Sequence, residues 1–248
     1  MCRHGKGPKA GVGYHRKRQR TMPDTPATFP QPGDRPAVLV TRPQPGADRL
    51  AAVLRGHGLT VLVAPLMRVI AVAHDEAALA AARGLVFTSA HAIAAAGPGL
   101  GRPAICVGPA TAEAARRAGF DVTSGPGDAA GLIPLLRGLG DGWLHPRGVH
   151  VAAELPVPGI VVYDQQAQPL GETARALLDQ TGTVIVPVMS PRSARIAADA
   201  TRSARAPLMI AAISRAAADA WTTRAAARAI AATPDEPGVT AAILSLAG

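Results

Sequence analysis

The sequence predicts an α/β fold made of two similar domains, each with a parallel sheet. Short runs of Val, Ile and Leu alternate with Ala-rich stretches of about ten residues, which is typical of strands buried on both faces between helices. The pattern also repeats. Val86-Phe87-Thr88-Ser89 ends an apolar run before an Ala-rich stretch, and Pro187-Val188-Met189-Ser190 does so about a hundred residues later. Two similar units in one chain predict a cleft between them, where ligands bind.

The first elements follow from hydrophobic periodicity. The apolar run 38–41 predicts a strand, and 47–55 predicts a helix with Leu50, Val53 and Leu54 on one face. A second strand is expected at 61–64. The stretch 66–73 alternates apolar positions and is expected to be an extended connector.

The same alternation continues to the end of the chain. In the middle, we expect strands at 85–89, 104–107, 122–123, 143–145 and 160–163, and helices at 91–96, 111–118 and 129–137. In the last third, we expect strands at 184–189, 208–213 and 229–232, and helices at 172–178, 193–200, 216–227 and 238–246.

Two extended connectors, 67–73 and 163–167, divide this series. The second domain, 74–162, is therefore expected to be inserted into the first, which consists of 37–66 and 168–248. The two connectors are expected to run parallel and to form a hinge.

Residues 1–36 differ in composition from the rest. They carry eight basic and two acidic residues and have no apolar periodicity, which predicts a disordered leader. They contain no apolar stretch of the kind found in secretory signals. The run Arg16-Lys17-Arg18-Gln19-Arg20 can bind nucleic acid, but an aromatic content of 3% leaves little for base stacking. We favour a leader without a function, with Met22 as an alternative start, over an Arg-rich transit peptide.

Composition also limits the class of protein. A hydrophobic content of 48% is ordinary for a globular protein. No apolar stretch approaches the roughly 18 residues of a membrane span. Cys2 and Cys106 are too few for a disulfide framework or a zinc site, and Cys106 lies in a strand-like run where a buried, inert thiol is expected. We therefore expect a soluble, cytoplasmic monomer without a metal, a membrane or a nucleic-acid partner.

Familiar catalytic motifs are absent from the sequence, including dinucleotide and phosphate loops, zinc-binding helices and nucleophile elbows. What recurs is a small hydroxyl residue or glycine where a strand ends before a helix. These residues are Thr88, Ser89, Gly108, Ser124, Gly125, Ser190, Ser214 and Thr233. Ligands bind at this edge of open α/β sheets, and helix N-termini there favour anions. Each hydroxyl alone can instead be a helix cap; the whole ring facing a cleft favours an anionic ligand.

Several short motifs, in their order and spacing, resemble the uroporphyrinogen-III synthase family over residues 37–248. The motifs are Val38-Leu39-Val40-Thr41-Arg42-Pro43, Ala64-Pro65-Leu66, Phe87-Thr88-Ser89-Ala90-His91-Ala92, Val107-Gly108-Pro109-Ala110-Thr111-Ala112, Ser124-Gly125-Pro126-Gly127-Asp128, Val162-Tyr163 and Ser190-Pro191-Arg192-Ser193. The resemblance implies the inserted two-domain architecture. It also implies cyclisation of hydroxymethylbilane to uroporphyrinogen III with inversion of ring D and loss of water, without a cofactor.

The resemblance also implies site residues. Tyr163 matches a tyrosine thought to assist the loss of the hydroxyl, because a phenol can donate a proton; alternatively it packs at an interface. Arg147 matches a basic position that can pair with a propionate, or it is an ordinary surface arginine. The positions that match the lining of the cleft are Thr88, Ser89, Gly108, Thr111, Ser190 and Ser193. Ser214 and Arg215 are also expected to bind the substrate.

The sequence departs from the family pattern at Ile213-Ser214-Arg215-Ala216-Ala217, where a glycine and a threonine are expected, and Arg215 can replace their contacts with an anion. The segment 148–157 is also shorter than the family's usual helix. Because of these departures, a second hypothesis stays open, namely a non-catalytic ligand-binding or regulatory protein with the same fold. A hinge-type solute-binding protein is a further alternative, disfavoured because no export signal precedes the α/β body.

Overall fold

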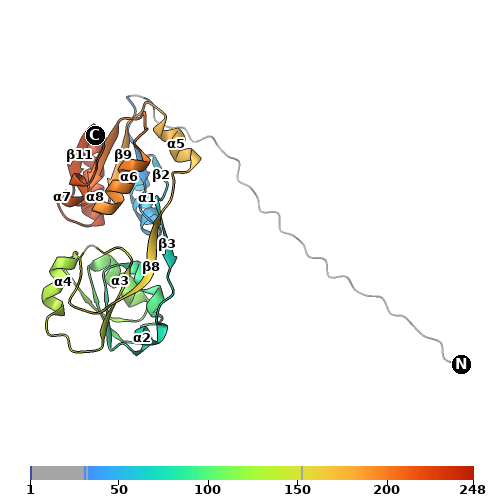
Figure 1. Ribbon diagram of the computed structural model, residues 1–248. Coiled ribbons are helices and arrows are strands. Elements are labelled where there is room, and N and C mark those ends of the chain that lie inside the picture. Colours follow the sequence, from blue (N-terminus) through green and yellow to red (C-terminus); the bar gives the residue numbers. More distant parts are fainter. Residues whose placement is uncertain (2–30, 32, 152) are drawn as a thin grey trace.

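The computed structural model describes Met1, Gln31 and residues 33–151 and 153–248 (Figure 1). Most of the expected leader lies outside the described residues. The described part consists of two α/β lobes joined by two strands (Figure 1). Among the helices of this part, none has the length and apolar character required to cross a membrane.

The first lobe is built on a five-stranded, fully parallel sheet in the order β11-β10-β9-β1-β2. Its strands are β1 (Ala37–Val40), β2 (Val61–Val63), β9 (Val184–Val188), β10 (Leu208–Ala212) and β11 (Ala227–Ile230). One face packs on α1 (Gly46–Gly56) and α8 (Glu236–Ala247). The other packs on α5 (Glu172–Leu178), α6 (Pro191–Ala200) and α7 (Arg215–Asp219). Apolar side chains on both faces explain the continuous Val and Ile runs.

The second lobe is built on a six-stranded sheet in the order β3-β8-β7-β4-β5-β6. Its strands are β3 (Met67–Ala71), β4 (Gly84–Phe87), β5 (Pro103–Cys106), β6 (Asp121–Ser124), β7 (Trp143–Gly148) and β8 (Gly159–Ala167). One face packs on α2 (Glu76–Ala81), α3 (Pro109–Arg117) and the 3-10 turns η1 (Ala90–Ala92) and η2 (Ala94–Ala96). The other packs on α4 (Ala129–Leu136) and on Leu155 and Val157. The predicted α/β class with mainly parallel sheets is confirmed.

The two strands that join the lobes, β3 and β8, are antiparallel. Met67 pairs with Ala167 and Ala71 pairs with Tyr163, so the expectation of parallel connectors is wrong. The chain runs out to the second lobe along β3 and returns along β8 (Figure 1). Opposite directions allow ladder hydrogen bonds between the two. We call β3 together with residues 163–167 of β8 the connector pair.

Two expected helices differ from the structure. The segment 91–96 forms two 3-10 turns, which end at Gly97 with a positive φ of 67°. The expected helix 216–227 stops at Asp219, after which Trp221 packs in the core of the first lobe. The β-branched Thr222 and Thr223 that follow are weak helix formers. Pro134 is accommodated within α4, as expected.

Candidate functional site

The carboxyl edges of the two sheets face each other across the joint between the lobes. β2 ends at Val63, and the chain enters the connector pair at Met67. β8 runs parallel to β7 and then continues toward the first lobe (Figure 1). His91, which follows β4, interacts electrostatically with Arg42, which follows β1. Residues of both edges therefore approach one another, as expected for ligand sites in open α/β sheets.

Thr88 at the second edge is held by a buried histidine. The Thr88 hydroxyl lies 2.9 Å from Nε2 of His145, whose side chain is 2% exposed. Burial, with a smaller contribution from Arg147, lowers the pKa of His145 to about 4. His145 is therefore a neutral hydrogen-bond partner near pH 7, and it fixes the rotamer of Thr88.

The N-terminus of α3 lies at the same edge and has no side-chain cap. Its N-cap is Gly108, and Pro109 follows. Thr111 is buried in the first turn. Gly108 packs against Gly127, because a Cβ at Gly108 would lie 3.0 Å from the Gly127 Cα. Backbone N–H groups in the first turn of an uncapped helix can bind an anion, and the helix dipole favours this.

Tyr163 is a residue of β8 and lies beside Gly148, the last residue of β7. A Cβ at Gly148 would lie 3.0 Å from the Tyr163 hydroxyl oxygen, so the ring packs over the glycine. The His91 ring meets the Tyr163 ring edge to face, with centroids 5.8 Å apart. Ser89 accepts a hydrogen bond from the His91 N–H at 3.3 Å and so begins this turn. Tyr163 is 7% exposed, so it is part of the core and also of the edge.

The first edge uses its hydroxyls as helix caps. Ser190 accepts from the Ser193 N–H at 3.1 Å, and the Ser193 hydroxyl accepts from the Ser190 N–H at 2.9 Å, which completes a capping box on α6. Ser214 accepts from the Ala217 N–H at 3.3 Å and caps α7. Arg215 follows it and is exposed. In the structure these serines stabilise helix ends.

Positive charge at the first edge comes from arginines. The Nη1 atom of Arg42 lies 3.0 Å from a carboxylate oxygen of Glu236. Burial lowers the pKa of Arg42, and Glu236 acts in the opposite direction. Arg49 is exposed. Burial, followed by Arg42 and Arg49, lowers the pKa of His91. The positive charges of both arginines thus act on His91 of the opposite lobe. A bound anion between the lobes would offset these positive charges.

The Arg147 side chain packs over Gly159. A Cβ there would lie 2.5 Å from its Nε atom. Its Nη1 atom is 3.8 Å from a carboxylate oxygen of the exposed Glu154. The buried Nε has no hydrogen-bond partner among the described residues. Arg147 therefore retains capacity for a further acceptor.

The structure groups the predicted residues into two sets. Thr88, Ser89, Gly108, Thr111 and Tyr163 lie at the second edge, and Ser190, Ser193, Ser214 and Arg215 lie at the first. Arg42, His91 and His145 were not predicted as site residues. Arg42 also follows a strand, but the rule that selected Thr88 was limited to small hydroxyl residues and glycine and so passed over it. The burial of His145 had no sequence signal.

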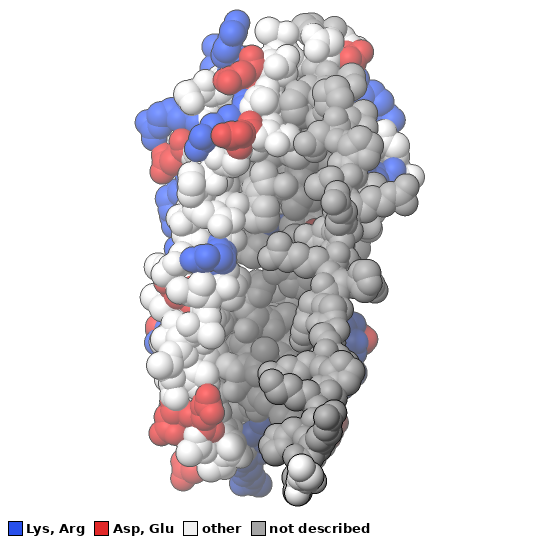
Figure 2. Space-filling view, turned by 90° about the vertical axis from the view of Figure 1, so that its right-hand side faces the viewer, with Lys and Arg blue, Asp and Glu red and all other residues white. Residues whose placement is uncertain are grey.

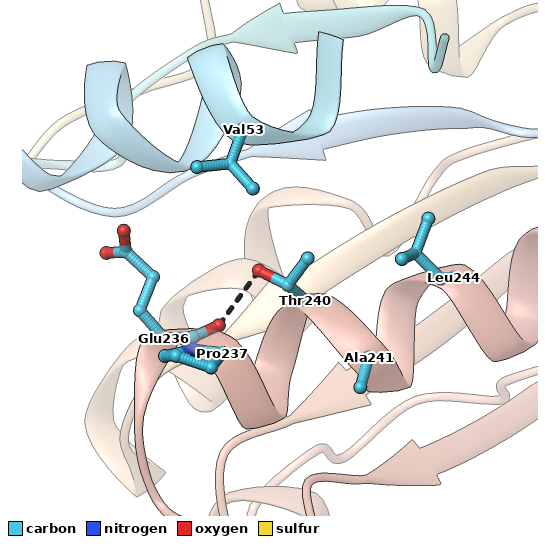
Figure 3. A pocket seen from close by; sticks show the side chains of 6 residues that line it. All are labelled: Val53, Glu236, Pro237, Thr240, Ala241 and Leu244. Carbon is cyan, nitrogen blue, oxygen red and sulfur yellow. Dashed lines mark hydrogen bonds between the residues drawn. The ribbon is translucent and has the colours of Figure 1, made fainter. Parts of the chain in front are cut away.

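Neither the cavities nor the potential metal ligands of the described residues indicate a second functional site. An apolar pocket of about 360 Å³ lies between α1 and α8, lined by Val53, Glu236, Pro237, Thr240, Ala241 and Leu244 (Figure 3). It belongs to the first lobe alone and lacks the facing strand ends. Within 33–151 and 153–248, no three His, Cys, Asp or Glu side chains are grouped to hold a metal. The Cys106 thiol is buried, as expected, and burial raises its pKa to about 11.

Surface charge is mixed on the side of the molecule shown in Figure 2. Basic and acidic side chains of the described residues are interspersed over both lobes there.

Together, these features define a two-lobed α/β protein with anion-accepting groups on facing strand ends. A family model described as uroporphyrinogen-III synthase HemD matches residues 48–241. The chain therefore belongs to the uroporphyrinogen-III synthase family, and this membership supports a role as an enzyme of tetrapyrrole biosynthesis.

Similarity to a solved structure supports the fold. The uroporphyrinogen-III synthetase of Helicobacter pylori 26695 is 16% identical with a TM-score of 0.54, covering 85% of this chain and 99% of that one. A mutant uroporphyrinogen III synthase of the extremely thermophilic bacterium Thermus thermophilus is 16% identical with a TM-score of 0.48, covering 85% and 98%. A comparison with curated proteins finds no match.

Proposed function

We propose that this protein cyclises hydroxymethylbilane to uroporphyrinogen III, with inversion of ring D and loss of water. The observation that carries the proposal is the pair of facing edges, one with an uncapped helix N-terminus at Gly108 and the other with Arg42 and Arg49. A substrate with eight carboxylates needs anion-binding groups on several sides. The reaction is a lyase reaction without a cofactor.

In this proposal the protein acts mainly by holding a flexible chain in the ring-closing geometry. Carboxylates bind at the first turn of α3 and near Thr88 and Ser89 on the second lobe. Others bind near Arg42 and Arg215 on the first lobe. Contacts from both lobes bring the two ends of the linear tetrapyrrole together, which lowers the entropic cost of closure.

Tyr163 is the proposed proton donor. Its hydroxyl lies at the carboxyl end of β7, beside Gly148. The phenolic proton passes to the substrate hydroxyl, which leaves as water and gives a cationic azafulvene. The α-carbon of ring D that already carries the bridge to ring C attacks the azafulvene. That bridge then breaks and re-forms at the other, free α-carbon of ring D, which inverts the ring. The free α-carbon loses its proton, which restores the phenol. His91, packed against the ring at 5.8 Å, keeps Tyr163 in place.

Arg147 is proposed to bind a propionate. Its present partner, Glu154, is 3.8 Å away and has a side chain that is 77% exposed. A solvent-exposed ion pair of this kind contributes little, so a substrate carboxylate can displace it.

The test is product identity. Purified protein is mixed with freshly prepared hydroxymethylbilane, and the oxidised porphyrin isomers are separated by chromatography. We expect isomer III. Formation of isomer I alone, at the rate of the protein-free control, would contradict the proposal; tight binding without turnover would then favour a non-catalytic ligand-binding protein.

A further inference from the structure

Arg192 lies between the two serines of the α6 capping box, and its side chain reaches the connector pair. Its Nη2 donates to the Gln165 carbonyl oxygen at 2.9 Å, and its Nη1 donates to the Met67 sulfur at 3.2 Å. Arg192 and Gln165 are half-buried, and Met67 is buried. Among the described residues, these are the side-chain hydrogen bonds that reach from a helix of the first lobe to the connector pair.

The connector pair belongs to the ladder of the second lobe. β8 pairs with β7 from Gly159 to Tyr163 and with β3 from Tyr163 to Ala167. Neither β3 nor β8 pairs with a strand of the five-stranded sheet. The connector pair and the second lobe therefore form one continuous sheet, which meets the first lobe at the ends of β3 and β8.

Leu66 and Leu170, which flank the connector pair, pack in the core of the first lobe, and the Leu66 N–H donates to the Thr41 carbonyl oxygen at 2.9 Å. The Gln168 side chain donates to the Pro65 carbonyl oxygen at 2.7 Å, and its N–H donates to Leu66. Both bonds tie one connecting strand to the other without involving a helix. Arg192 is different, because it ties both strands to the N-terminus of α6.

We propose that Arg192 is a positioning residue that sets the angle between the lobes, and with it the spacing of the two strand edges. This inference rests on the proposed function, in which one substrate contacts both edges. The guanidinium suits the task, because its planar fork donates in two directions from one rigid group. The same turn contains Ser190 and Ser193, which lie at the first edge.

Removing these bonds widens the range of lobe orientations. Only the fraction of molecules with correctly spaced edges binds substrate, so the apparent dissociation constant rises by the reciprocal of that fraction. The bound substrate contacts both lobes itself and selects the competent orientation. The turnover number at saturation therefore stays the same. A purely structural role would instead lower the amount of folded enzyme, with KM unchanged.

The kinetic test compares three variants of the full chain with hydroxymethylbilane. Arg192→Met keeps an apolar stem and loses the donors, and Arg192→Lys keeps a single donor group. Arg195→Met is the matched control, since Arg195 is exposed on the same helix. For Arg192→Met we expect KM to rise about three- to tenfold, with kcat within twofold. Arg192→Lys should be intermediate, and Arg195→Met should match the wild type.

A second test does not depend on turnover. Spin labels are placed at the exposed positions His57→Cys on the first lobe and Asp141→Cys on the second, in a Cys2→Ser background. Cys106 is fully buried and should not react. The distribution of label distances should broaden in Arg192→Met and remain narrow in Arg195→Met.

An unchanged distance distribution in Arg192→Met overturns the inference, as does a fall in kcat at constant KM. If the wild type yields isomer I alone, the proposed reaction is wrong. The label distances still decide whether Arg192 sets the angle between the lobes.

Discussion

The two strand edges have the same architecture but use their helix N-termini differently. At the second edge, α3 begins at Gly108 without a side-chain cap. At the first edge, α6 begins with the reciprocal Ser190 and Ser193 box, and Ser214 caps α7. α3 therefore leaves backbone donors available to a ligand, whereas α6 and α7 use theirs within the protein. The contrast concerns these helices, because α1 at the first edge also begins without a side-chain cap and Asp128 caps α4 at the second.

If both edges bind the anionic substrate, as proposed, two similar units share anion binding without using the same groups. Arg42 and Arg49 supply charge at the first edge, and their field reaches His91 on the second. The second edge supplies backbone N–H groups, a fixed Thr88 hydroxyl and the phenol of Tyr163. Binding groups are thus distributed over both edges, while the proposed chemistry belongs to one.

The largest expected effect concerns Tyr163. Tyr163→Phe keeps the ring that packs against His91 and Gly148 and removes only the hydroxyl. If the phenol is the proton donor, kcat should fall about 100-fold or more, while KM should change little. Steady-state kinetics with hydroxymethylbilane measure both constants, and thermal unfolding checks that the fold is intact. Turnover equal to that of the wild type would limit Tyr163 to a packing role.

The pH dependence of stability should also distinguish the two edges. Only the second edge has a hydroxyl, that of Thr88, held by a buried neutral imidazole, that of His145. The pKa of His145 is about 4 in the folded protein and near 6.5 when unfolded. The unfolded chain therefore binds a proton first as the pH falls. The contribution of His145 to stability is complete above pH 6.5 and is lost between pH 6.5 and 4. Over this range the loss is about 3 kcal/mol.

Chemical unfolding at a series of pH values measures this loss. His145→Gln keeps a polar partner for Thr88 and should flatten the curve between pH 6.5 and 4. The remaining slope includes His91, whose pKa is also lowered by burial. His57→Gln serves as the control, because His57 is exposed at the end of α1. An equal slope in the wild type and His145→Gln would show that His145 is not the group responsible.

The sequence predicts the fold well where hydrophobic patterns are continuous. The runs around Val38 and Val184 match β1 and β9, since buried parallel strands need apolar residues on both faces. It fails where local propensity is ambiguous. An Ala-rich composition favours a helix after Ser214, but the burial of Trp221 ends α7 early. The direction of the connectors depends on chain path, which has no local signal.

The site was partly predictable for similar reasons. Strand ends followed by helices identify Thr88, Gly108 and Ser190, because geometry places them at one edge. The pattern cannot tell whether a hydroxyl is free or acts as a cap. Ser193 is 6% exposed and bonded within its own turn, and only three-dimensional packing shows this. Contacts between distant segments, such as Arg192 with Gln165, were also beyond the sequence.

Smaller effects are expected when the caps are exchanged, and these exchanges test the comparison most directly. Gly108→Ser places a hydroxyl where it can accept from the free N–H groups of α3, as Ser190 does on α6. KM should then rise about tenfold, which corresponds to about 1.4 kcal/mol. Gly108→Ala is the matched control, because it adds the same Cβ, 3.0 Å from Gly127, without the hydroxyl. The difference between these two variants isolates the effect of the cap.

The reverse exchange, Ser190→Gly, removes a cap from the first edge. Glycine is itself tolerated as an N-cap, so the free energy of unfolding should fall by only a few tenths of a kcal/mol. KM should stay within about twofold, because Arg42 and Arg49, rather than the N-terminus of α6, supply the charge at this edge. Steady-state kinetics give KM, and urea unfolding gives the free energy of unfolding, for Gly108→Ser, Gly108→Ala and Ser190→Gly. If Ser190→Gly weakens binding as much as Gly108→Ser does, the two edges bind alike and their different caps have no functional meaning.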